Sequence, residues 1–455
     1  MKKIDNKELI KYFLIFVYSF ICLLFIYTLS RGDLYVNYGF SYAISRGEVP
    51  YVDFNLVILP FAPFLYSLFL IFSKSIICYY LGQALLLTIF SYFVFKLLGK
   101  KAWLYFIILL MPFPIAMASV IFPGYNFLLL LLTTIIIYLE KEKSSDYVLG
   151  FLLGLLFITK QTVGGLLCLA SLYYLFSDYK KVLKRIGTFF IPVICCLIYL
   201  ILTNSLSNCI DLCFLGLFDF GHSNFYYDTF YLICLILAFL VIAYRTIKKP
   251  KDITNYYLLL FMSCSFPLID YYHVSLFLAL FFLIIFSDLK IGKDLTKYAL
   301  TFILVLGLVW TFVQIQYINN FKIVNYKNLE LSIFSDKYIK NVEKLDRYLA
   351  KQDRDVVYFL RGSENYFYKI KGNLDITYFD LPNYGNYGYS GNDKIIKRLS
   401  KLKDVLIVID KGCYLSDDDF QQYVKEAVTY IIDNSKLVKK IGNYEVYLKE
   451  WFYLC

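Results

Sequence analysis

The chain has 455 residues, of which 59% are hydrophobic, and its mean hydropathy is +0.60. These values exclude a soluble globular protein, because a soluble surface needs far more polar area. The formal net charge of +11 would favour nucleic-acid binding in a soluble chain, but in a membrane protein basic residues first report the side on which a loop lies. We expect no nucleic-acid partner. The 11 Cys include no C-x2-C pair, so zinc or redox chemistry is not expected.

Apolar stretches of about 20 residues predict the membrane spans. The first follows Lys2 and Lys3 as in a signal peptide, but it has no small-residue cleavage site, and we expect a retained anchor. In this way the sequence predicts a polytopic α-helical membrane protein with about 11 transmembrane helices. They are expected near residues 10–29, 76–95, 102–118, 126–139, 147–159, 163–176, 186–203, 229–247, 255–268, 272–287 and 297–317.

Lys and Arg predict the topology, because cytoplasmic loops carry an excess of both. One alternation collects 19 of them in residues 1–9, 96–101, 140–146, 177–185, 245–254 and 288–297. The opposite loops before residue 318 hold four, which are Arg31, Arg46, Lys74 and Lys160. We therefore expect a cytoplasmic N-terminus, an external loop 31–75 and an external tail. The apolar residues 59–72 are too few to cross, and we expect a half-buried or re-entrant helix there.

From about residue 322 the composition becomes that of a soluble domain. Helical spacing of apolar residues predicts a helix over 336–351, and the acids that open 415–433 favour a second one. Residues 355–362 and 404–412 are typical of buried strands, and a hairpin is expected around Gly442 and Asn443. The sequence thus predicts a transmembrane module, 1–320, followed by a small extracytoplasmic α/β domain, 321–455.

Five polar residues beside the predicted spans are candidates for chemistry. Asp33 and Asp53 both lie in the first external loop, although a solvated loop acid is the simple alternative for Asp33. Lys160 is expected at the external end of a span, where a lone lysine often only snorkels to the headgroups. Asp270 and His273 lie in a predicted external turn, where a hydrogen-bonded interfacial histidine is the alternative.

Residues 33–55, DLYVNYGFSYAISRGEVPYVDFN, and the apolar helix after them resemble the first external loop of the GT-C glycosyltransferases. The likeness is to the protein-mannosyltransferase-like and aminoarabinose-transferase-like branch, in which this loop is catalytic. The matching residues are Asp33, Gly47, Pro50, Tyr51, Asp53, Phe54, Pro60 and Pro63. The sequence departs from many relatives, which have His-Pro-Pro in this loop, so no histidine of the loop would contribute.

Three later stretches extend the resemblance. Lys160 and Gln161, in ITKQTVGG, look like the family's contact to the lipid phosphate. Asp270 and His273 are similar to its D-x-x-H turn, which would also serve the donor. FPGYN at 122–126 resembles a short outward loop near the acceptor side, although a Pro-Gly turn is sufficient explanation.

The resemblance implies an inverting glycosyltransferase of the hexosyltransferase type that uses a polyprenyl-phosphate sugar donor. Asp33 would accept the proton of an acceptor hydroxyl, and Lys160 would offset the phosphate charge. Asp53 would position the acceptor, the sugar hydroxyls or a divalent ion, so metal use stays open and the sequence requires no cofactor. The acceptor would be a surface glycan, a teichoic acid or a lipid-linked repeat, and a Lys-, Ile- and Asn-rich composition favours a bacterial plasma membrane.

Two other classes stay open. A polysaccharide polymerase or ligase would have a similar number of spans, but such proteins use Arg- and His-rich external loops, and residues 204–228 contain no Arg or Lys. A transporter of lipid-linked sugar would need no catalytic carboxylate and would show discontinuous helices. A purely structural role is a further alternative.

Overall fold

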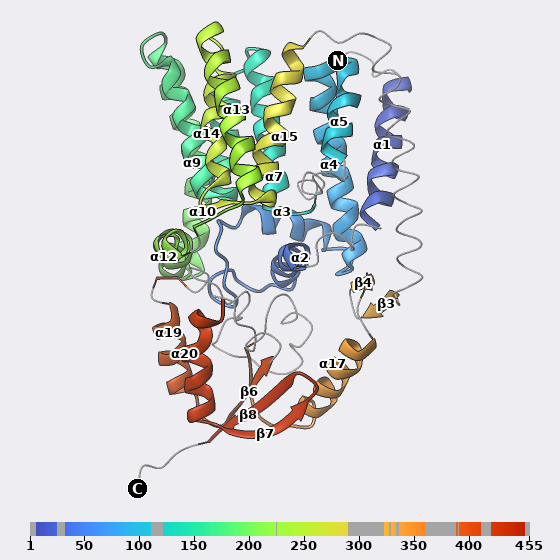
Figure 1. The fold of residues 1–455 in the computed structure, drawn as a ribbon, viewed down its shortest axis with the longest axis vertical. Coiled ribbons are helices and arrows are strands. Elements are labelled where there is room, and N and C mark those ends of the chain that lie inside the picture. Colours follow the sequence, from blue (N-terminus) through green and yellow to red (C-terminus); the bar gives the residue numbers. More distant parts are fainter. Residues whose placement is uncertain are drawn as a thin grey trace. The chain divides into compact units, whose positions relative to one another are not determined.

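The computed structural model (Figure 1) describes residues 6–24, 32–110, 122–223, 225–289, 323–326, 329–333, 336–359, 388–389, 391–410 and 420–450. Contacts divide the chain into two compact units. The helical unit consists of Met1–Tyr38, Leu59–Ile198 and Phe225–Asn320, and the α/β unit of Gly39–Ile58, Tyr199–Asn224 and Phe321–Cys455. The division predicted at residue 320 would instead place residues 39–58 and 199–224 in the transmembrane module.

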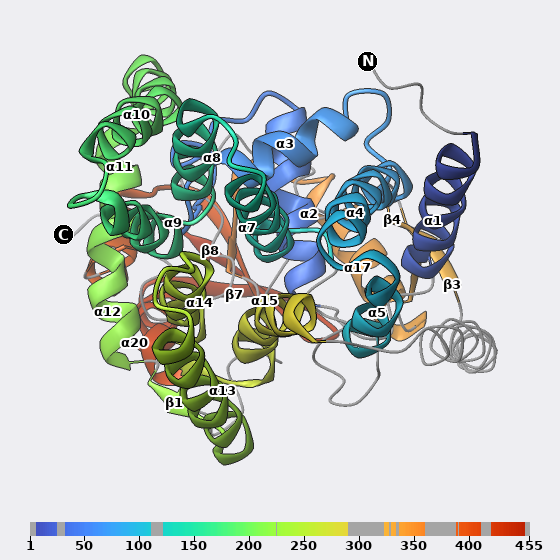
Figure 2. The same ribbon diagram turned by 90° about the horizontal axis from the view of Figure 1, so that it is seen from above.

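The helical unit is built of apolar helices (Figure 2). Its helices up to the middle of the chain are α1 (Asn6–Leu24), α2 (Gly32–Ser45), α3 (Phe61–Phe69), α4 (Ile76–Leu98), η2 (Gly99–Lys101), α5 (Ala102–Leu110), α7 (Tyr125–Lys141), α8 (Asp146–Thr159), α9 (Gln161–Leu169) and η3 (Ala170–Tyr174). They are followed by α10 (Tyr179–Leu202), β1 (Tyr226–Tyr227), α13 (Thr229–Lys248), α14 (Thr254–Phe261), η5 (Met262–Ser265), β2 (Leu268–Ile269) and α15 (Tyr271–Asp288). Helices α2 and α10 continue into the α/β unit.

Four stretches of the described residues are long and apolar enough to cross a membrane: Ile76–Ile107, Tyr179–Leu202, Thr229–Lys248 and Tyr271–Asp288. The prediction of about 11 spans is therefore not confirmed. The spans expected at 126–139, 147–159, 163–176 and 255–268 correspond to α-helices of 17, 14, 9 and 8 residues. These fall short of the roughly 20 residues that a span needs. The span expected at 297–317 lies outside the described residues, as does the end of 102–118.

The stretch Ile76–Ile107 reverses its direction at η2. The rings of Phe90 and Tyr105 are 6.3 Å apart, whereas fifteen residues of one straight helix would separate them by about 22 Å. Helix α3 has nine residues, or about 13 Å, so the helix expected in 59–72 exists and is too short to cross.

Contacts between distant loops define one end of the helical unit, here called the basic end. Lys101 Nζ donates to the carbonyl oxygen of Phe286 at 2.7 Å and to that of Ser287 at 3.1 Å, which joins the end of α4 to the end of α15. Lys141, the last residue of α7, donates to Ser287 Oγ at 3.0 Å. Helices α7 and α15 therefore run parallel and finish at the basic end.

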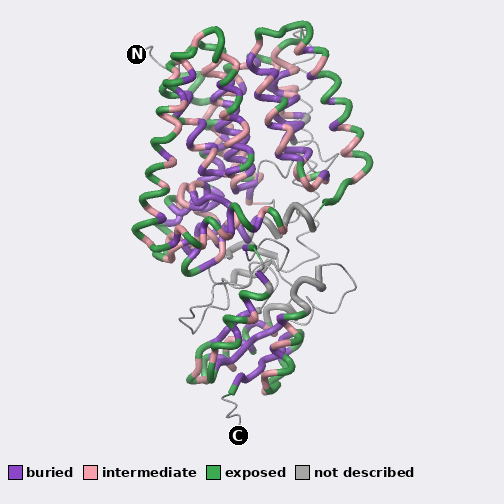
Figure 3. The backbone as a smooth tube through the Cα atoms, turned by 90° about the vertical axis from the view of Figure 1, so that its left-hand side faces the viewer, coloured by how far each residue is buried: buried purple, intermediate pink, exposed green. Residues whose placement is uncertain are grey.

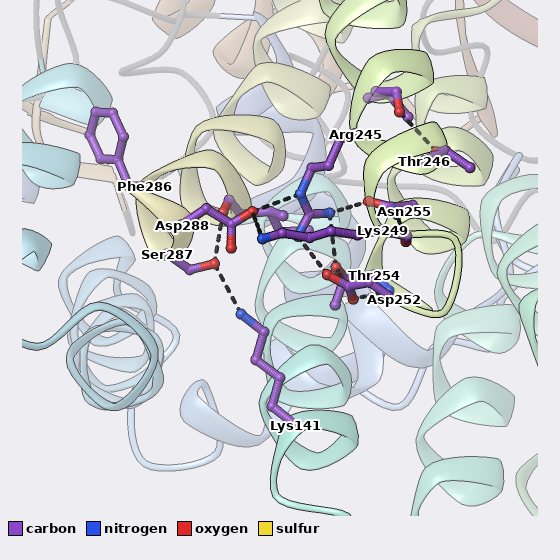
Figure 4. Close-up of polar contacts among 12 residues, drawn as sticks. Lys141, Arg245, Thr246, Lys249, Asp252, Thr254, Asn255, Phe286, Ser287 and Asp288 are labelled. Atoms are coloured by element: carbon purple, nitrogen blue, oxygen red, sulfur yellow. Dashed lines mark hydrogen bonds and ion pairs between the residues drawn. The ribbon is translucent and has the colours of Figure 1, made fainter. Parts of the chain in front are cut away.

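A buried arginine organises this end (Figure 4). Arg245, in the last turn of α13, is 6% exposed, and its Nε lies 2.9 Å from Asp288 Oδ2 while Nη2 lies 2.7 Å from Asp252 Oδ2. Lys249 Nζ also pairs with Asp288 at 2.9 Å, and Asn255 accepts a hydrogen bond from Arg245. Each buried charge thus has a partner, as low-dielectric burial requires.

Arg185 of α10 is a second buried arginine that connects neighbouring helices through ion pairs. Its guanidinium pairs with Glu140 of α7, with Nη2 at 3.1 Å from Oε2, and its Nε lies 2.8 Å from Asp146 of α8. Together with the Arg245 cluster, these contacts bring the predicted basic loops 96–101, 140–146, 177–185 and 245–254 to one end. Its assignment to the cytoplasm stays a prediction.

The opposite end is here called the Lys160 end. Helix α7 runs about 24 Å from Tyr125 to Lys141, so Tyr125 lies away from the basic end. Helix α8 returns antiparallel to α7 after a short turn, which brings its last residue, Thr159, beside the start of α7. Helix α15 begins at the same end because it is parallel to α7.

The α/β unit contains a four-stranded sheet in the order β5 (Val356–Phe359), β6 (Val405–Asp410), β8 (Tyr444–Lys449), β7 (Lys436–Ile441). Strands β5 and β6 are parallel and the other pairs are antiparallel. The unit also contains α11 (Leu206–Ile210), η4 (Asp211–Leu215), α12 (Gly216–Ser223), β3 (Ile323–Tyr326), β4 (Leu329–Ile333), α17 (Asp336–Leu349), α19 (Gly391–Lys401) and α20 (Phe420–Asp433).

Helices cover both faces of this sheet. Leu406 and Val408 of β6 pack with the buried residues of α17, whereas Ile407 and Ile409 pack with those of α19 and α20. This alternation follows the period of two in a strand and explains the continuous apolar run of β6. Figure 3 shows buried strand residues in this unit, although the edge strand β7 is mostly exposed.

The elements predicted in the tail are confirmed by α17, β5, β6, α20 and the β7–β8 hairpin. Helix α19, which carries Ile395 and Leu399 at helical spacing, was not predicted.

Candidate functional site

The loop that carries the resemblance motif is a compact turn within the α/β unit. Tyr51 is 1% exposed, adopts a φ of +68°, and donates from its hydroxyl to the carbonyl oxygen of Ile58 at 2.7 Å. Phe54 is fully buried and stacks on Phe40 with ring centroids 5.8 Å apart. The motif residues therefore have a structural task, which is to close this loop.

Asp53 is an exposed residue of the loop. Its Oδ2 accepts a hydrogen bond from the backbone N–H of Val49 at 2.6 Å, and its own N–H donates to the carbonyl oxygen of Val49 at 2.9 Å. The carboxylate is thus held in place by the backbone while it stays accessible to solvent.

A pocket lies beside this loop, also within the α/β unit. It is lined by Tyr51 and Asn55 of the loop, Asn208 and Asp211 of the α11–η4 segment, and Lys394 and Arg398 of α19. Lys394 Nζ lies 2.5 Å from Asp211 Oδ2, and Asn208 Nδ2 donates to the carbonyl oxygen of Tyr51 at 2.8 Å. Amide, carboxylate and cationic groups in one hollow are the donors and acceptors that a polyhydroxylated ligand can use.

Asp33 lies in the first turn of α2, and its side chain lies outside the described residues. Asn37 follows four residues later, about 6 Å further along the same helix. Asn37 packs on Gly124, because a Cβ at Gly124 would lie 3.0 Å from Asn37 Cγ. Gly124 immediately precedes Tyr125, so α2 approaches the Lys160 end close to Asp33.

Lys160 occupies the break between α8 and α9. Its backbone is extended, with φ −150° and ψ 107°, and the chain then turns back on itself. Gly164 permits this return, because a Cβ there would lie 2.3 Å from the backbone nitrogen of Phe157. The Lys160 ammonium lies 5.3 Å from the ring centroid of Tyr125, the first residue of α7. A cation–π contact of this kind contributes about 0.5–2 kcal/mol.

Two helices begin at this point, and neither has a side-chain cap. Gly124 precedes α7 and Lys160 precedes α9, and neither of these two residues caps its helix through its side chain. The helix dipole makes such an end attractive to anions. Among the described residues, no carboxylate lies within salt-bridge distance of the Lys160 ammonium. The Lys160 end is therefore a local concentration of positive charge.

Asp270 and His273 have a different local task, because Asp270 caps α15. Its Oδ1 accepts from the backbone N–H of Tyr272 at 3.0 Å and of His273 at 2.9 Å, and it lies 2.8 Å from His273 Nδ1. Partial burial raises the pKa of Asp270, but the hydrogen bonds and charge of His273 lower it, and the net pKa is below its ordinary value. N-cap geometry thus accounts for this pair.

Cys264 lies near both His273 and Lys160. Its Sγ lies 3.9 Å from the carbonyl oxygen of His273, and it interacts electrostatically with Lys160. Gln161, buried as the first residue of α9, completes the set of predicted residues at this end. The structure therefore gathers Lys160, Gln161, Asp270 and His273 at one end of the helical unit, whereas Asp53 belongs to the α/β unit.

Sequence reasoning missed part of the Lys160 end. Tyr125 and Asn126, which is 6% exposed, were both read only as part of the FPGYN turn. Within the described residues, Asn126 Oδ1 is buried without a hydrogen-bond partner. The available signal was a Gly-Tyr-Asn sequence at the start of an otherwise apolar helix. The described residues also contain no group of three or more His, Cys, Asp or Glu that could hold a metal ion.

The apolar helices are those of a helical membrane protein, and the C-terminal sheet belongs to an additional α/β unit. Comparisons with protein-family models, curated proteins and solved structures give no match. The function is therefore argued from the residues of this chain.

Proposed function

We propose that this protein is a membrane glycosyltransferase that moves a sugar from a polyprenyl-phosphate donor to an acceptor hydroxyl on the outer face of the membrane. The observation that carries the proposal is Lys160, an ammonium group with no described carboxylate partner beside two uncapped helix starts. A lipid-linked phosphate is the anion that matches a site at the end of apolar helices. Ionisable groups in such a place are expensive to keep and are commonly functional.

In this proposal the residues divide the work of a single displacement. Lys160 and the positive ends of the α7 and α9 helix dipoles offset the charge of the departing phosphate. Asp33, four residues before the Asn37 contact with Gly124, accepts the proton of the attacking hydroxyl. One displacement inverts the configuration at the anomeric carbon. Asp270 orients His273 at the donor side.

Asp53 and the pocket beside it are assigned to the acceptor. The Val49 N–H holds the Asp53 carboxylate, which suits a residue that positions hydroxyl groups or a divalent ion. The pocket between Asn208, Lys394 and Arg398 offers further hydrogen bonds to an external glycan. Cell-surface polysaccharide or teichoic acid is the proposed acceptor class, with a polysaccharide polymerase or ligase as the alternative enzyme.

Transport of a lipid-linked sugar without chemistry is the second candidate. The interruption of the apolar helices at Lys160 favours it, because transporters bind anionic substrate groups at the starts of broken helices. Both candidates use the Lys160 site, and they differ in whether Asp33 is needed.

The test is surface-glycan composition in cells that carry Asp33→Asn or Lys160→Gln, with protein levels checked in the membrane. Asp433→Asn, at the exposed end of α20, and Lys180→Gln, exposed at the basic end, are matched controls. A transferase loses the same sugar substituent in both test variants and keeps it in both controls. A transporter keeps it in Asp33→Asn and loses it in Lys160→Gln. Unchanged glycans in both test variants would refute both candidates.

A further inference from the structure

A groove at the basic end lies between α1, α4 and α5, which stand side by side in Figures 1 and 2. It is lined by three lysines, Lys11, Lys96 and Lys100, and by the aromatic rings of Tyr12, Phe95 and Trp103. Its volume is about 410 Å³ and it opens to solvent, a size at which small ligands are held. None of the sites above uses these residues.

The groove carries a net positive charge, because its lining contains three lysines and one glutamate. Lys11 Nζ pairs with Glu8 Oε2 at 2.9 Å, whereas neither Lys96 nor Lys100 has a carboxylate at salt-bridge distance within the described residues. Lys101, the next residue, differs because its ammonium donates to the carbonyl groups at the end of α15. Two ammonium groups thus remain for an anion.

The aromatic residues give the groove an amphipathic wall. The Lys96 ammonium lies 5.3 Å from the ring centroid of Tyr92, and the rings of Phe95 and Trp103 are 5.0 Å apart. Lysine and tryptophan side chains together are typical of the level at which headgroups meet hydrocarbon.

An exposed apolar stripe leads along α4 to this groove. Leu81, Leu85, Ile89 and Tyr92 follow one another at helical spacing, each 37–46% exposed, and Lys96 continues the series. The stripe covers about 22 Å of helix. A ligand with a charged head and a long apolar chain matches the groove and the stripe together, whereas a free anion matches only the groove.

We propose that this groove binds the headgroup of an anionic phospholipid, with its phosphate against Lys96 and Lys100 and an acyl chain along the α4 stripe. Basic pockets between membrane helices are suited to this role. The site lies at the end of the unit opposite to Lys160, and the proposal does not depend on glycosyl transfer.

The test is lipid retention by the purified full-length protein, measured by native mass spectrometry with dioleoylphosphatidylglycerol and dioleoylphosphatidylcholine as probes. The variant Lys96→Gln/Lys100→Gln is compared with Lys180→Gln/Lys184→Gln, which removes two lysines of α10 at the same end. The control is close, because Lys184 also lies 5.5 Å from a tyrosine ring. At about fivefold per lysine, we expect roughly 25-fold weaker phosphatidylglycerol binding in the first variant only.

Glu8→Gln provides a second measurement that removes no lysine. Loss of its carboxylate frees Lys11, so binding of phosphatidylglycerol should become up to about fivefold tighter. Equal losses in the two lysine variants, or unchanged binding in all of them, would overturn the proposal. So would inorganic phosphate that displaces the lipid at equal concentration, because the groove would then bind a free anion.

Discussion

Lys160 and Arg185 offer a contrast between a half-buried and a fully buried cation, and the contrast tests whether Lys160 has a structural or a binding role. Arg185 is 2% exposed and is held by Glu140 and Asp146. The described partners of the Lys160 ammonium are the ring of Tyr125 and the thiol of Cys264, and they include no carboxylate. The same change, to glutamine, should therefore have opposite consequences at the two positions.

The magnitudes follow from what each change leaves behind. Arg185→Gln leaves the Glu140 carboxylate, 4% exposed, without its cation, and breaking such a buried pair costs about 3–5 kcal/mol. Lys160→Gln gives up a cation–π contact of about 0.5–2 kcal/mol. It also removes a half-buried ammonium, whose partial desolvation is itself unfavourable. We therefore expect Lys160→Gln to leave stability unchanged or to raise it.

Ligand affinity should respond in the reverse order, with the larger loss in Lys160→Gln. A charge-assisted hydrogen bond to a phosphate contributes about 1.5–3 kcal/mol, so Lys160→Gln should weaken polyprenyl-phosphate binding by roughly 10- to 150-fold. The assay is thermal unfolding of the purified protein in detergent, with and without a polyprenyl phosphate. Wild type should be stabilised by the lipid and Lys160→Gln should not. If Lys160→Gln unfolds as early as Arg185→Gln, the lysine is a structural cation and the assignment of the phosphate site is refuted.

Three further predictions, with five substitutions, test separate parts of the structure. Gly164→Ala should prevent accumulation of folded protein, because its Cβ would meet the α8 backbone at 2.3 Å. Gly187→Ala has open space around its Cβ and should stabilise the protein by up to about 1 kcal/mol. Membrane levels and unfolding temperatures check both substitutions. The lowered pKa of Asp270 means that its stabilisation is complete above the ordinary carboxylate pKa and is lost as the pH falls through the lower folded-state value. Acid unfolding of Asp270→Asn should therefore depend less on pH than that of wild type, and equal slopes would contradict this. Asp53→Ala removes the acceptor for the Val49 N–H and should cost about 1 kcal/mol, whereas Asp53→Asn keeps an oxygen there and should be milder, as unfolding temperatures would show.

Local sequence patterns predicted much of the fold. The strands of the tail were visible as short apolar runs, and β6 in particular is apolar along its whole length because both of its faces are covered. Its partner helix α19 was missed, since its first residues follow a Tyr- and Gly-rich stretch that resembles a loop. The prediction of about 11 membrane spans is not confirmed, and one reason is that apolar windows cannot reveal where a helix stops, as at Lys160 or after Leu169.

The candidate site was predictable only in part. Lys160, Asp270 and His273 were identified as polar residues between apolar stretches, and this requires no knowledge of packing. The Asp270 cap is also a local feature, since its partners lie two and three residues away. In contrast, the motif loop around Tyr51 was interpreted as a catalytic loop. Its buried residues show that several of them stabilise the loop itself.

The sequence by itself determined that the chain is apolar and helical, that it ends in a small α/β fold, and where its isolated charges lie along the chain. These properties depend on composition and on the spacing of neighbouring residues. Only the tertiary structure decided which charges have partners: Arg185 meets Glu140 across 45 residues, whereas Lys160 meets the ring of Tyr125. Such pairings depend on which helices pack together and in which direction, and that is set by contacts between residues far apart in the sequence.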